Sequence, residues 1–319
     1  MTTACAAGID AGKSYLDVGL APSRRHFRVP NGCEGIEHIV GRLHEAGIDK
    51  VVLEAIGPYA QPVVTRLVAA GFTVGLVNPR RIKAFREAEG RSAKTDRLDA
   101  ALIARFAVKM TDALRPVPSA DQQLLKALAT RRRQLVEMIA MEKTRLKQAA
   151  EPWLCESHRC AIAMLTAERQ RIEADLEARL AADPKQLRQR AILQSLPGFG
   201  VSVSTTLITD MPELGTLDRR AAASLSGLAP HPSQSGSGPA RNEIAGGRPC
   251  VRTAVYMAAL SAIRCDPRFK AEYQAMREAG KPAKVAIIAI ARRLIVLANA
   301  LLKNDVLYDP EHNIAANAP

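Results

Sequence analysis

Two aspartates stand three residues apart at the head of a predicted helix, in the stretch KTDRLDAALIARFA over residues 94–107. On an α-helix, Asp96 and Asp99 lie about 60° apart and therefore share one face. Two carboxylates at this spacing repel each other, and a cation held between them would remove the repulsion. The alternative is that both are solvated first-turn carboxylates that complement the helix dipole. The pair alone leaves both interpretations open.

Two further acids lie in apolar segments that are typical of buried strands. Asp10 ends the segment CAAGID, and Glu54 lies within or at the end of KVVLEAIG. An isolated acid in an apolar strand is costly to bury unless it is paired or bound to a metal. The pattern over residues 1–78 predicts the element order βββαβαβ. A polar segment over 80–90, irregular or a short helix, and a helix over 96–110 follow.

The order of these acids predicts an RNase H-like (RuvC-like) α/β domain. In that fold the first and fourth strands lie side by side, and the following helix packs over their ends. The carboxylates of Asp10, Glu54, Asp96 and Asp99 would then converge and could hold two divalent ions about 4 Å apart, an arrangement used in phosphoryl transfer. Hard oxygen ligands favour Mg²⁺ or Mn²⁺. Whether one ion or two would bind stays open.

The chain carries an excess of positive charge that is concentrated in its C-terminal part. It has 319 residues, a formal net charge of +13 and an isoelectric point of about 9.8. Residues 219–293 hold 13 Lys and Arg against 4 Asp and Glu, whereas residues 1–110 hold 16 against 11. This balance favours a polyanionic partner, most simply nucleic acid. Because aromatic residues make up only 4% of the chain, contacts to phosphates are expected rather than stacking on bases.

Composition also indicates a globular protein of a reducing compartment. Hydrophobic residues make up 47% of the sequence, and no run of 18 apolar residues predicts a membrane span. The cysteines form no CxxC pair, and Cys155, His158 and Cys160 lack the second ligand cluster of a zinc site. The first residues lack the charged and apolar regions of a secretory signal. A cytoplasmic protein without a membrane partner is therefore expected.

The pattern of elements predicts three domains and a tail. Residues 1–115 form the α/β domain, and residues 116–195 form a long helical hairpin with a coiled-coil-like repeat, an expected oligomerisation arm. Its helices cover 119–150 and 158–195, with a turn near Glu151-Pro152 and a break near Asp183-Pro184. Residues 196–305 form a mainly helical domain that ends in a helix over about 283–302, and residues 306–319 form a loose tail.

Two segments of the C-terminal domain could contact nucleic acid. In LQSLPGFGVSVSTTLITDM, Gly198 and Gly200 can free backbone N–H groups for a phosphate, as in a helix-hairpin-helix element. The alternative is a simple corner between two helices. The segment APHPSQSGSGPARNEIAGGRPCVR is a loop rich in small residues, and Arg241, Arg248 and Arg252 in and after it could contact phosphates.

These segments together resemble a known family. GIDAGKSYLDVGL, VVLEAIGPYAQPVVTRL, KTDRLDA and GLAPHPSQSGSG…AGGRPCVR are similar to motifs of bacterial insertion-sequence transposases with a DEDD tetrad on a RuvC-like domain. Pilin-gene invertases are relatives of that family. The resemblance covers nearly the whole chain. It implies that Asp10, Glu54, Asp96 and Asp99 form the tetrad, whose metal is Mg²⁺ or Mn²⁺.

The resemblance also implies a nucleophile and partners. In that family a serine before a glycine attacks DNA and forms a phosphoserine link; Ser235 is the first choice, and Ser237 is the alternative because the repeat SGSG makes the alignment ambiguous. Such enzymes assemble as dimers or tetramers, act on element-end and target DNA, and use a structured guide RNA. The chain is therefore expected to be a DNA recombinase.

Two other functions remain compatible with the residues alone. A metal-dependent nuclease of the Holliday-junction-resolvase type would need only the acids, with water as the nucleophile. A non-enzymatic nucleic-acid-binding protein would need neither the acids nor the serine. Loss of strand joining in Ser235→Ala would separate a serine recombinase from a hydrolase.

Overall fold

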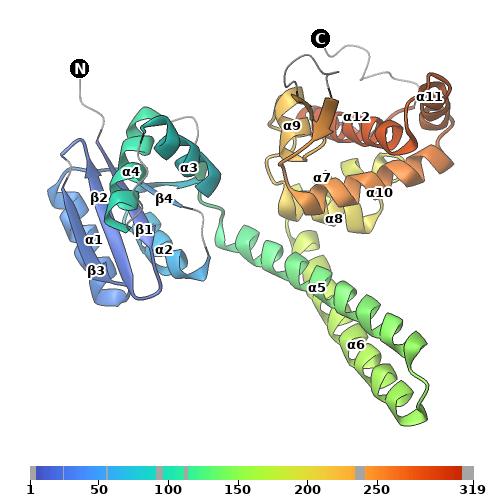
Figure 1. The fold of residues 1–319 in the computed structure, drawn as a ribbon, viewed down its shortest axis with the longest axis horizontal. Coiled ribbons are helices and arrows are strands. Elements are labelled where there is room, and N and C mark those ends of the chain that lie inside the picture. Colours follow the sequence, from blue (N-terminus) through green and yellow to red (C-terminus); the bar gives the residue numbers. More distant parts are fainter. Residues whose placement is uncertain are drawn as a thin grey trace. The chain divides into compact units, whose positions relative to one another are not determined.

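The computed structural model describes residues 5–23, 25–54, 57–90, 96–110, 114–233 and 241–310. The chain divides into two compact units, Met1–Ser119 and Ala120–Pro319, each with its own hydrophobic core (Figure 1). The first unit is an α/β domain, and the second consists mainly of helices. This is the fold class that the sequence predicts.

A six-stranded sheet with the order β3-β2-β1-β4-β5-β6 forms the centre of the first unit. Strands β1, β4 and β5 are parallel, β2 is antiparallel to both of its neighbours, and β6 is antiparallel to β5. The neighbouring positions of β1 and β4 are those of an RNase H-like sheet, and the order βββαβαβ is confirmed. The elements are β1 (Ala6–Ala11), β2 (Tyr15–Ala21), β3 (His26–Pro30), α1 (Cys33–Glu45), β4 (Lys50–Glu54), a 3₁₀ turn (Pro58–Ala60), α2 (Gln61–Ala69), β5 (Thr73–Val77), α3 (Pro79–Ala88), α4 (Asp96–Lys109) and β6 (Arg115–Pro116).

Different helices cover the two faces of this sheet. One core cluster joins Ile9 and Leu53 of the strands to side chains of α1 and α2. The other joins Ala6 and Val52 to side chains of α3 and α4. Because successive side chains of a strand point to opposite faces, the even-numbered residues of β1 and β4 face α3 and α4. Any functional side chain at an even position of these strands therefore lies on the α4 face.

The polar segment after β5 is the short helix that the sequence left as one of two possibilities. Pro79 opens α3 at a position that tolerates proline, and the Asn78 side chain accepts a hydrogen bond from the Arg80 backbone N–H at 2.9 Å. The helix α4 has the predicted limits within one residue. The two-residue strand β6 gave no signal in the sequence, since half of it is proline.

The second unit is built from eight helices and one small hairpin within the described residues. Its core is formed mainly by α7, α8, α10 and α12. The elements are α5 (Ala120–Gln148), α6 (Pro152–Ala182), α7 (Pro184–Ser195), α8 (Val201–Asp210), α9 (Arg219–Leu225), β7 (Pro230–Ser233), β8 (Arg241–Ile244), α10 (Pro249–Cys265), α11 (Pro267–Glu278) and α12 (Ala283–Asn304).

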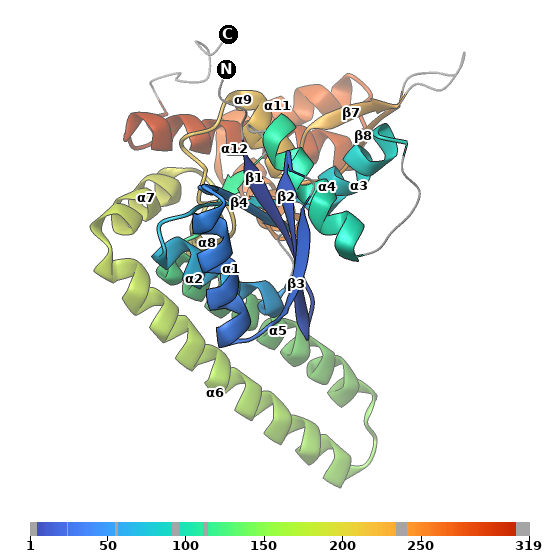
Figure 2. The same cartoon turned by 90° about the vertical axis from the view of Figure 1, so that its left-hand side faces the viewer.

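Helices α5 and α6 pack side by side as a long hairpin (Figures 1 and 2). The turn near Glu151-Pro152 and the break at Asp183-Pro184 fall where the sequence predicts them. The second helix begins at Pro152 rather than at residue 158, because proline is tolerated in the first turn of a helix. Two residues of the RRR triplet fasten this hairpin: Arg132 pairs with Glu173 at 2.8 Å, and Arg133 pairs with Asp210 at 2.6 Å.

The segment predicted as a loop contains the antiparallel strands β7 and β8 on either side of residues 234–240. The prediction of a continuous loop was therefore wrong for both flanks. Prolines at positions 230 and 232 hid the first strand, because proline is rare in paired strands. Two short strands at the edge of a helical unit tolerate it.

Among the described residues, one helix is long and apolar enough to cross a membrane, namely α12. It lies in the core of the second unit, where 56% of its most apolar 18-residue window is buried. Its contacts are with α7, α9, α10 and α11. Its apolar character is therefore accounted for by packing within this unit.

Candidate active site

Asp10 and Glu54 end two neighbouring parallel strands of the first unit. In the register of β1 and β4, Ile9 lies beside Leu53, so the next pair along the strands is Asp10 beside Glu54. Both acids are even-numbered and therefore face α3 and α4, and both are partly buried. The two strands thus bring together the first two acids that the sequence singled out.

Asp17 belongs to the same row of side chains and was missed in the sequence. It lies directly opposite Asp10 in the antiparallel ladder of β1 and β2, and it is only 3% exposed. Two cations of β3 neutralise it. The Arg28 guanidinium donates Nε–H to both carboxylate oxygens at 3.0 and 3.1 Å, and His26 Nε2 lies 2.8 Å from Oδ1. Its only sequence signal was an acid inside the apolar segment YLDVGLA.

Helix α4 crosses this face in direct contact with the main chain of the sheet. A Cβ atom added to Gly8 would lie 2.3 Å from the Ala104 nitrogen, and one added to Gly19 would lie 2.7 Å from atoms of Ala100 and Ala101. Only glycine allows the helix to approach β1 and β2 so closely. The two glycines are paired with each other across the two strands.

The direction of α4 follows from its two ends. The Lys50 ammonium at the start of β4 donates to the Ala107 carbonyl at 3.1 Å, so the last turn of the helix lies at the amino end of β4. Because Ala100 lies over Gly8, the helix runs opposite to β1 and β4. Its first turn, which begins at Asp96, therefore points toward the carboxyl ends of these strands, where Asp10 and Glu54 lie.

Asp99 is held by a cation from the neighbouring helix. It is 8% exposed, and its Oδ1 accepts a hydrogen bond from Arg86 Nη2 of α3 at 2.5 Å. This ion pair neutralises a carboxylate that would otherwise be costly to bury. Asp96 occupies the first position of α4, and its side chain lies outside the described residues.

The described donors fit the chemistry of a hard divalent cation, although they do not complete a site. Asp10 and Glu54 supply carboxylate oxygens from adjacent strands, which Mg²⁺ and Mn²⁺ prefer. Within the described ranges, no group of three or more His, Cys, Asp or Glu side chains is arranged to hold a metal ion. The ion pair of Asp99 with Arg86 is one reason, because that carboxylate already has a partner.

The two candidate nucleophiles, Ser235 and Ser237, lie outside the described residues. Their segment joins β7 to β8, whose register pairs Ser233 with Arg241. The Arg241 side chain is likewise outside the description. The serine segment is thus tied at both ends to one antiparallel hairpin of the second unit.

The arginines that follow the hairpin have partners inside the protein. Arg248 donates to the Glu213 carboxylate at 2.6 and 2.8 Å and to the Asp210 carbonyl at 2.6 Å. Burial opposes its charged form, but Glu213 outweighs burial and raises the pKa of the guanidinium. Arg252 makes longer bonds, of 3.4 and 3.3 Å, to the carbonyls of Gly227 and Gly246. These contacts support a structural role for Arg248 and leave Arg252 the better placed for a phosphate.

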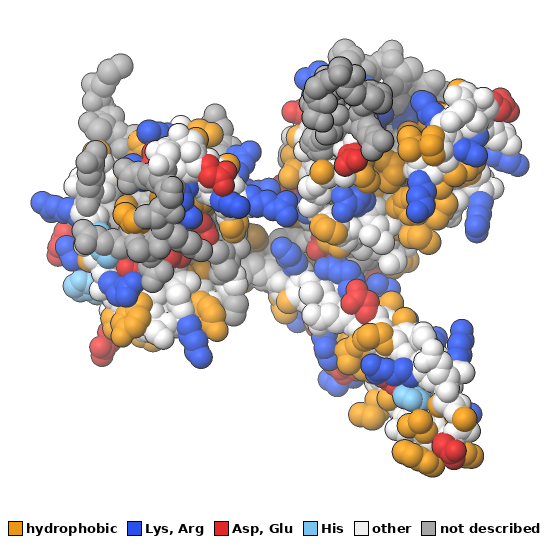
Figure 3. Space-filling view, in the orientation of Figure 1, with side chains coloured by type: hydrophobic (Ala, Val, Ile, Leu, Met, Phe, Trp, Pro, Cys, Tyr) orange, Lys and Arg blue, Asp and Glu red, His pale blue; other side chains and the backbone are white. Residues whose placement is uncertain are grey.

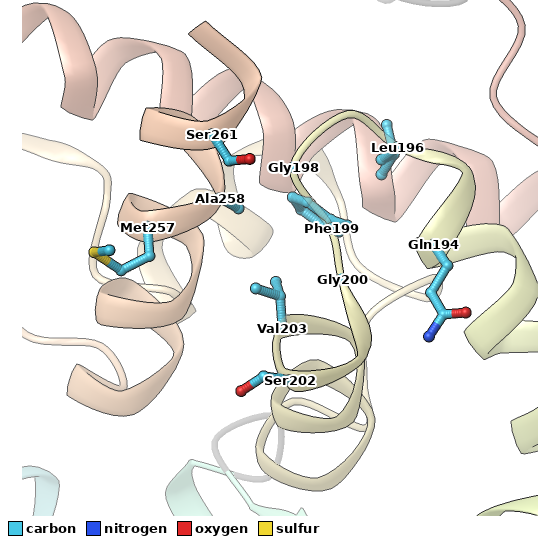
Figure 4. Close-up of a pocket in the computed structure, with 10 residues that line it drawn as sticks. All are labelled: Gln194, Leu196, Gly198, Phe199, Gly200, Ser202, Val203, Met257, Ala258 and Ser261. Atoms are coloured by element: carbon cyan, nitrogen blue, oxygen red, sulfur yellow. The ribbon is translucent and has the colours of Figure 1, made fainter. Parts of the chain in front are cut away.

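Gly198 and Gly200 lie in the tight turn between α7 and α8, opposite Ala258 and Ser261 of α10 (Figure 4). Gly198 has φ +79°, and a Cβ atom there would lie 2.2 Å from the Ala258 carbonyl oxygen. Gly200 precedes the first turn of α8 and has open space around it. A hollow of about 460 Å³ lies beside the turn. The helix–turn–helix arrangement agrees with the sequence, and its contact with nucleic acid stays a prediction.

Comparison with known proteins identifies relatives of both units. A DEDD transposase profile of the IS110 type matches residues 7–151, and the profile described as "Transposase IS116/IS110/IS902 family" matches residues 190–274. The pilin gene-inverting protein of Moraxella bovis is 25% identical over 263 residues, which cover 81% of each chain. The insertion element IS900 uncharacterized 42 kDa protein of Mycobacterium paratuberculosis is 33% identical over 148 residues, covering 44% of this chain and 36% of that protein.

Among solved structures, RuvC of Thermus thermophilus in complex with a Holliday junction substrate is similar to part of the chain. The match covers 35% of this chain and 99% of that chain, with 19% sequence identity and a TM-score of 0.28. The RNase H-like assignment rests on the strand order and not on this likeness. Because profiles of one transposase family match both units, the chain belongs to the IS110 family of transposases, enzymes that recombine DNA.

Proposed function

We propose that this transposase cuts and rejoins the DNA of an insertion sequence with an acidic centre in the first unit and a serine in the second. The observation that supports it best is the adjacency of Asp10 and Glu54 on the sheet face that α4 covers. Asp99 lies on that helix, and Asp96 begins it. Carboxylates gathered on one face have a use in phosphoryl transfer that they lack in folding alone.

In this proposal, Asp10, Glu54, Asp96 and Asp99 hold Mg²⁺ or Mn²⁺. A bound divalent ion would neutralise charge on the scissile phosphate and favour departure of the leaving oxygen. The chain itself fixes where this happens. The strands hold two of the acids in register, and α4, seated on Gly8 and Gly19, holds the others. Whether one or two ions bind is part of what the proposal leaves to experiment.

The serine would act as the nucleophile in a transesterification. The Ser235 hydroxyl loses its proton, its oxygen bonds to the phosphorus, and the bond from phosphorus to one sugar oxygen breaks. That oxygen leaves as a hydroxyl after taking up a proton, and the DNA stays linked to the enzyme as a phosphoserine. Attack by a hydroxyl of another strand reverses the step and joins DNA. Ser237 is the alternative nucleophile.

The partners in this proposal are DNA, a structured guide RNA and further copies of the chain. DNA and RNA are favoured by the net charge of +13, with Gly198, Gly200, Arg241 and Arg252 as candidate phosphate contacts. A dimer or tetramer is favoured by the α5–α6 hairpin, on which Figure 3 shows hydrophobic side chains at the surface. Trp153 is 71% exposed and Met164 is 74% exposed, so an apolar partner would stabilise this arm. Action on DNA places the protein in the cytoplasm.

Covalent trapping tests the serine step. The full chain, an RNA transcribed from the flanks of its gene and labelled element-end DNA are mixed with Mg²⁺ and separated under denaturing conditions. We expect a protein–DNA adduct that peptide mapping places at Ser235. The adduct should disappear in Ser235→Ala and in Asp10→Ala and persist in Ser233→Ala, the matched control.

Three results would contradict the proposal in different ways. An adduct at Ser237 would reassign the nucleophile and keep the mechanism. Metal-dependent cutting without any adduct would make the protein a nuclease that uses water, of the Holliday-junction-resolvase type. DNA binding without cutting in any divalent metal would indicate a binding protein.

A further inference from the structure

A groove of about 930 Å³ runs through the second unit, between α9, α11 and α12. Its floor is apolar and includes Ala223 of α9 with Ile290 and Leu297 of α12. One end is bounded by Ala229 and Pro230, where strand β7 begins. The groove is separate from the turn that holds Gly198 and from the acidic face of the first unit.

The rim of this groove is strongly basic. Five cations come from three elements, namely Arg219 and Arg220 at the start of α9, Lys281 before α12, and Arg292 and Arg293 within α12. One acid lines it, Glu272 of α11, which pairs with Arg293 at 2.5 Å. Among the described residues, Arg220, Lys281 and Arg292 have no carboxylate within ion-pair distance. Cations gathered in this way repel one another, so folding alone gives no reason for them.

We infer that this groove binds the phosphate backbone of the DNA strand that the enzyme cuts. A polyanion is the partner that a row of basic side chains over a concave surface fits best. None of the described residues that line the groove is aromatic, so base stacking contributes little and the contacts are to phosphates. Binding there is accordingly independent of base sequence and sensitive to salt.

The neighbouring hairpin is the reason for assigning DNA to the groove. Ser235 follows Pro230 by five residues in the chain, and an extended chain of that length spans at most about 18 Å. A strand that lies in the groove therefore passes within reach of the serine segment. This assignment rests on the proposed serine mechanism, whereas the charge of the groove does not.

The test compares two triple variants of the full chain that lose the same charge. The groove variant is Arg220→Gln, Lys281→Gln and Arg292→Gln. The control variant is Arg131→Gln, Lys147→Gln and Arg171→Gln, three exposed positions on the α5–α6 hairpin. Binding of labelled element-end duplex and of guide RNA is measured by fluorescence anisotropy over a range of salt concentrations. Equal melting temperatures establish that both variants fold, and the double variant of Arg220 and Lys281 replaces the triple if it does not.

We expect the groove variant to bind duplex DNA at least about tenfold more weakly, with a salt dependence reduced by about two to three ions. The control variant should bind DNA within about twofold of the unchanged protein, and RNA binding should be the same in all three. Equal DNA affinity in both variants would overturn the inference, as would a loss confined to RNA.

Failure of this inference is distinguishable from failure of the serine mechanism. An adduct that forms normally in the groove variant, together with normal DNA binding, removes the groove and leaves the serine step intact. Absence of any adduct in the unchanged protein, together with weakened DNA binding in the groove variant, removes the serine step and leaves the groove as a DNA-binding site.

Discussion

Asp10 and Asp17 face each other directly across the ladder of β1 and β2. Two carboxylates in this position repel, and the structure relieves the repulsion on one side only, because Arg28 and His26 neutralise Asp17. A row of charged side chains thus crosses four strands, from Arg28 through Asp17 and Asp10 to Glu54. Asp17 separates the cations of β3 from the acids that are candidates for metal binding.

This separation predicts the behaviour of Asp17→Asn. The amide keeps the shape of the side chain but loses its charge, so the cations of Arg28 and His26 act on Asp10. We expect the Mg²⁺ concentration needed for half-maximal cleavage to rise by about threefold or more, with the same change in a Mg²⁺-dependent thermal shift. Adding Arg28→Gln should restore much of the loss. Asp49→Asn, at an exposed site of the same unit, is the control, and an equal Mg²⁺ response in both single variants would refute this role.

Arg86→Met tests whether a metal can replace the partner of Asp99. Removal of the guanidinium leaves a nearly buried carboxylate without its cation, which we expect to cost about 3 kcal/mol of unfolding free energy. If Asp99 takes part in a Mg²⁺ site, saturating Mg²⁺ should stabilise Arg86→Met more than the unchanged protein. Arg81→Met on the exposed side of the same helix is the control. Equal stabilisation by Mg²⁺ in all three proteins would argue against Asp99 as a ligand.

Gly8→Ala should disturb the acidic centre without touching an acid. Its added methyl group would lie within 2.5 Å of main-chain atoms of α4, so the helix must move away. We expect a loss of about 1–3 kcal/mol of stability and a severe loss of strand cleavage. Gly41→Ala on α1 has open space and should be neutral or slightly stabilising. Chemical unfolding and the trapping assay measure both effects, and full activity in Gly8→Ala would contradict the assigned packing.

The two glycines of the α7–α8 turn should respond differently to alanine. Gly198→Ala combines a left-handed backbone with a clash against the Ala258 carbonyl, and we expect it to cost about 2–4 kcal/mol of stability. Gly200→Ala meets no atom and has an ordinary negative φ, so its stability should change little. Urea unfolding of the two variants measures the difference. Similar losses in both would mean that the turn is not shaped as described.

Cys250 should react more slowly with iodoacetamide than the exposed Cys265 at the other end of α10. Burial raises the pKa of the Cys250 thiol above its ordinary 9.0, so a smaller fraction is thiolate at any pH below that range. Its labelling rate should therefore still be rising above pH 9. Peptide mapping after timed labelling between pH 7 and 10 measures both rates, and a plateau below pH 9 at Cys250 would show the opposite shift.

The sequence was sufficient for the elements whose patterns are local. Alternating and continuous apolar segments predicted the strands that hold Asp10 and Glu54, and Pro184 marked the break between α6 and α7. It was insufficient where the third dimension decides. Asp17 was missed because its partners lie on another strand, and β7 was missed because two prolines contradict strand propensity.

The same division holds within the candidate site. The carboxylates could be chosen from their positions at strand ends and at a helix start, because residue type and position are visible in the sequence. The internal partners of Asp99 and Arg248 could not, because Arg86 and Glu213 meet them only after the helices have packed. The need for glycine at positions 8 and 19 is likewise a property of the packed sheet and helix.

The contact of α4 with the main chain at Gly8 and Gly19 also bears on how such a protein can diverge. In most cores, substitutions of side chains change the separation between a helix and a sheet, since side chains fill the space between them. Here no side chain lies between α4 and these two strand positions, so the separation is set by atoms that every sequence shares. Mutations can therefore accumulate through much of this core while the height of the acid-bearing helix above the acid-bearing strands stays constant.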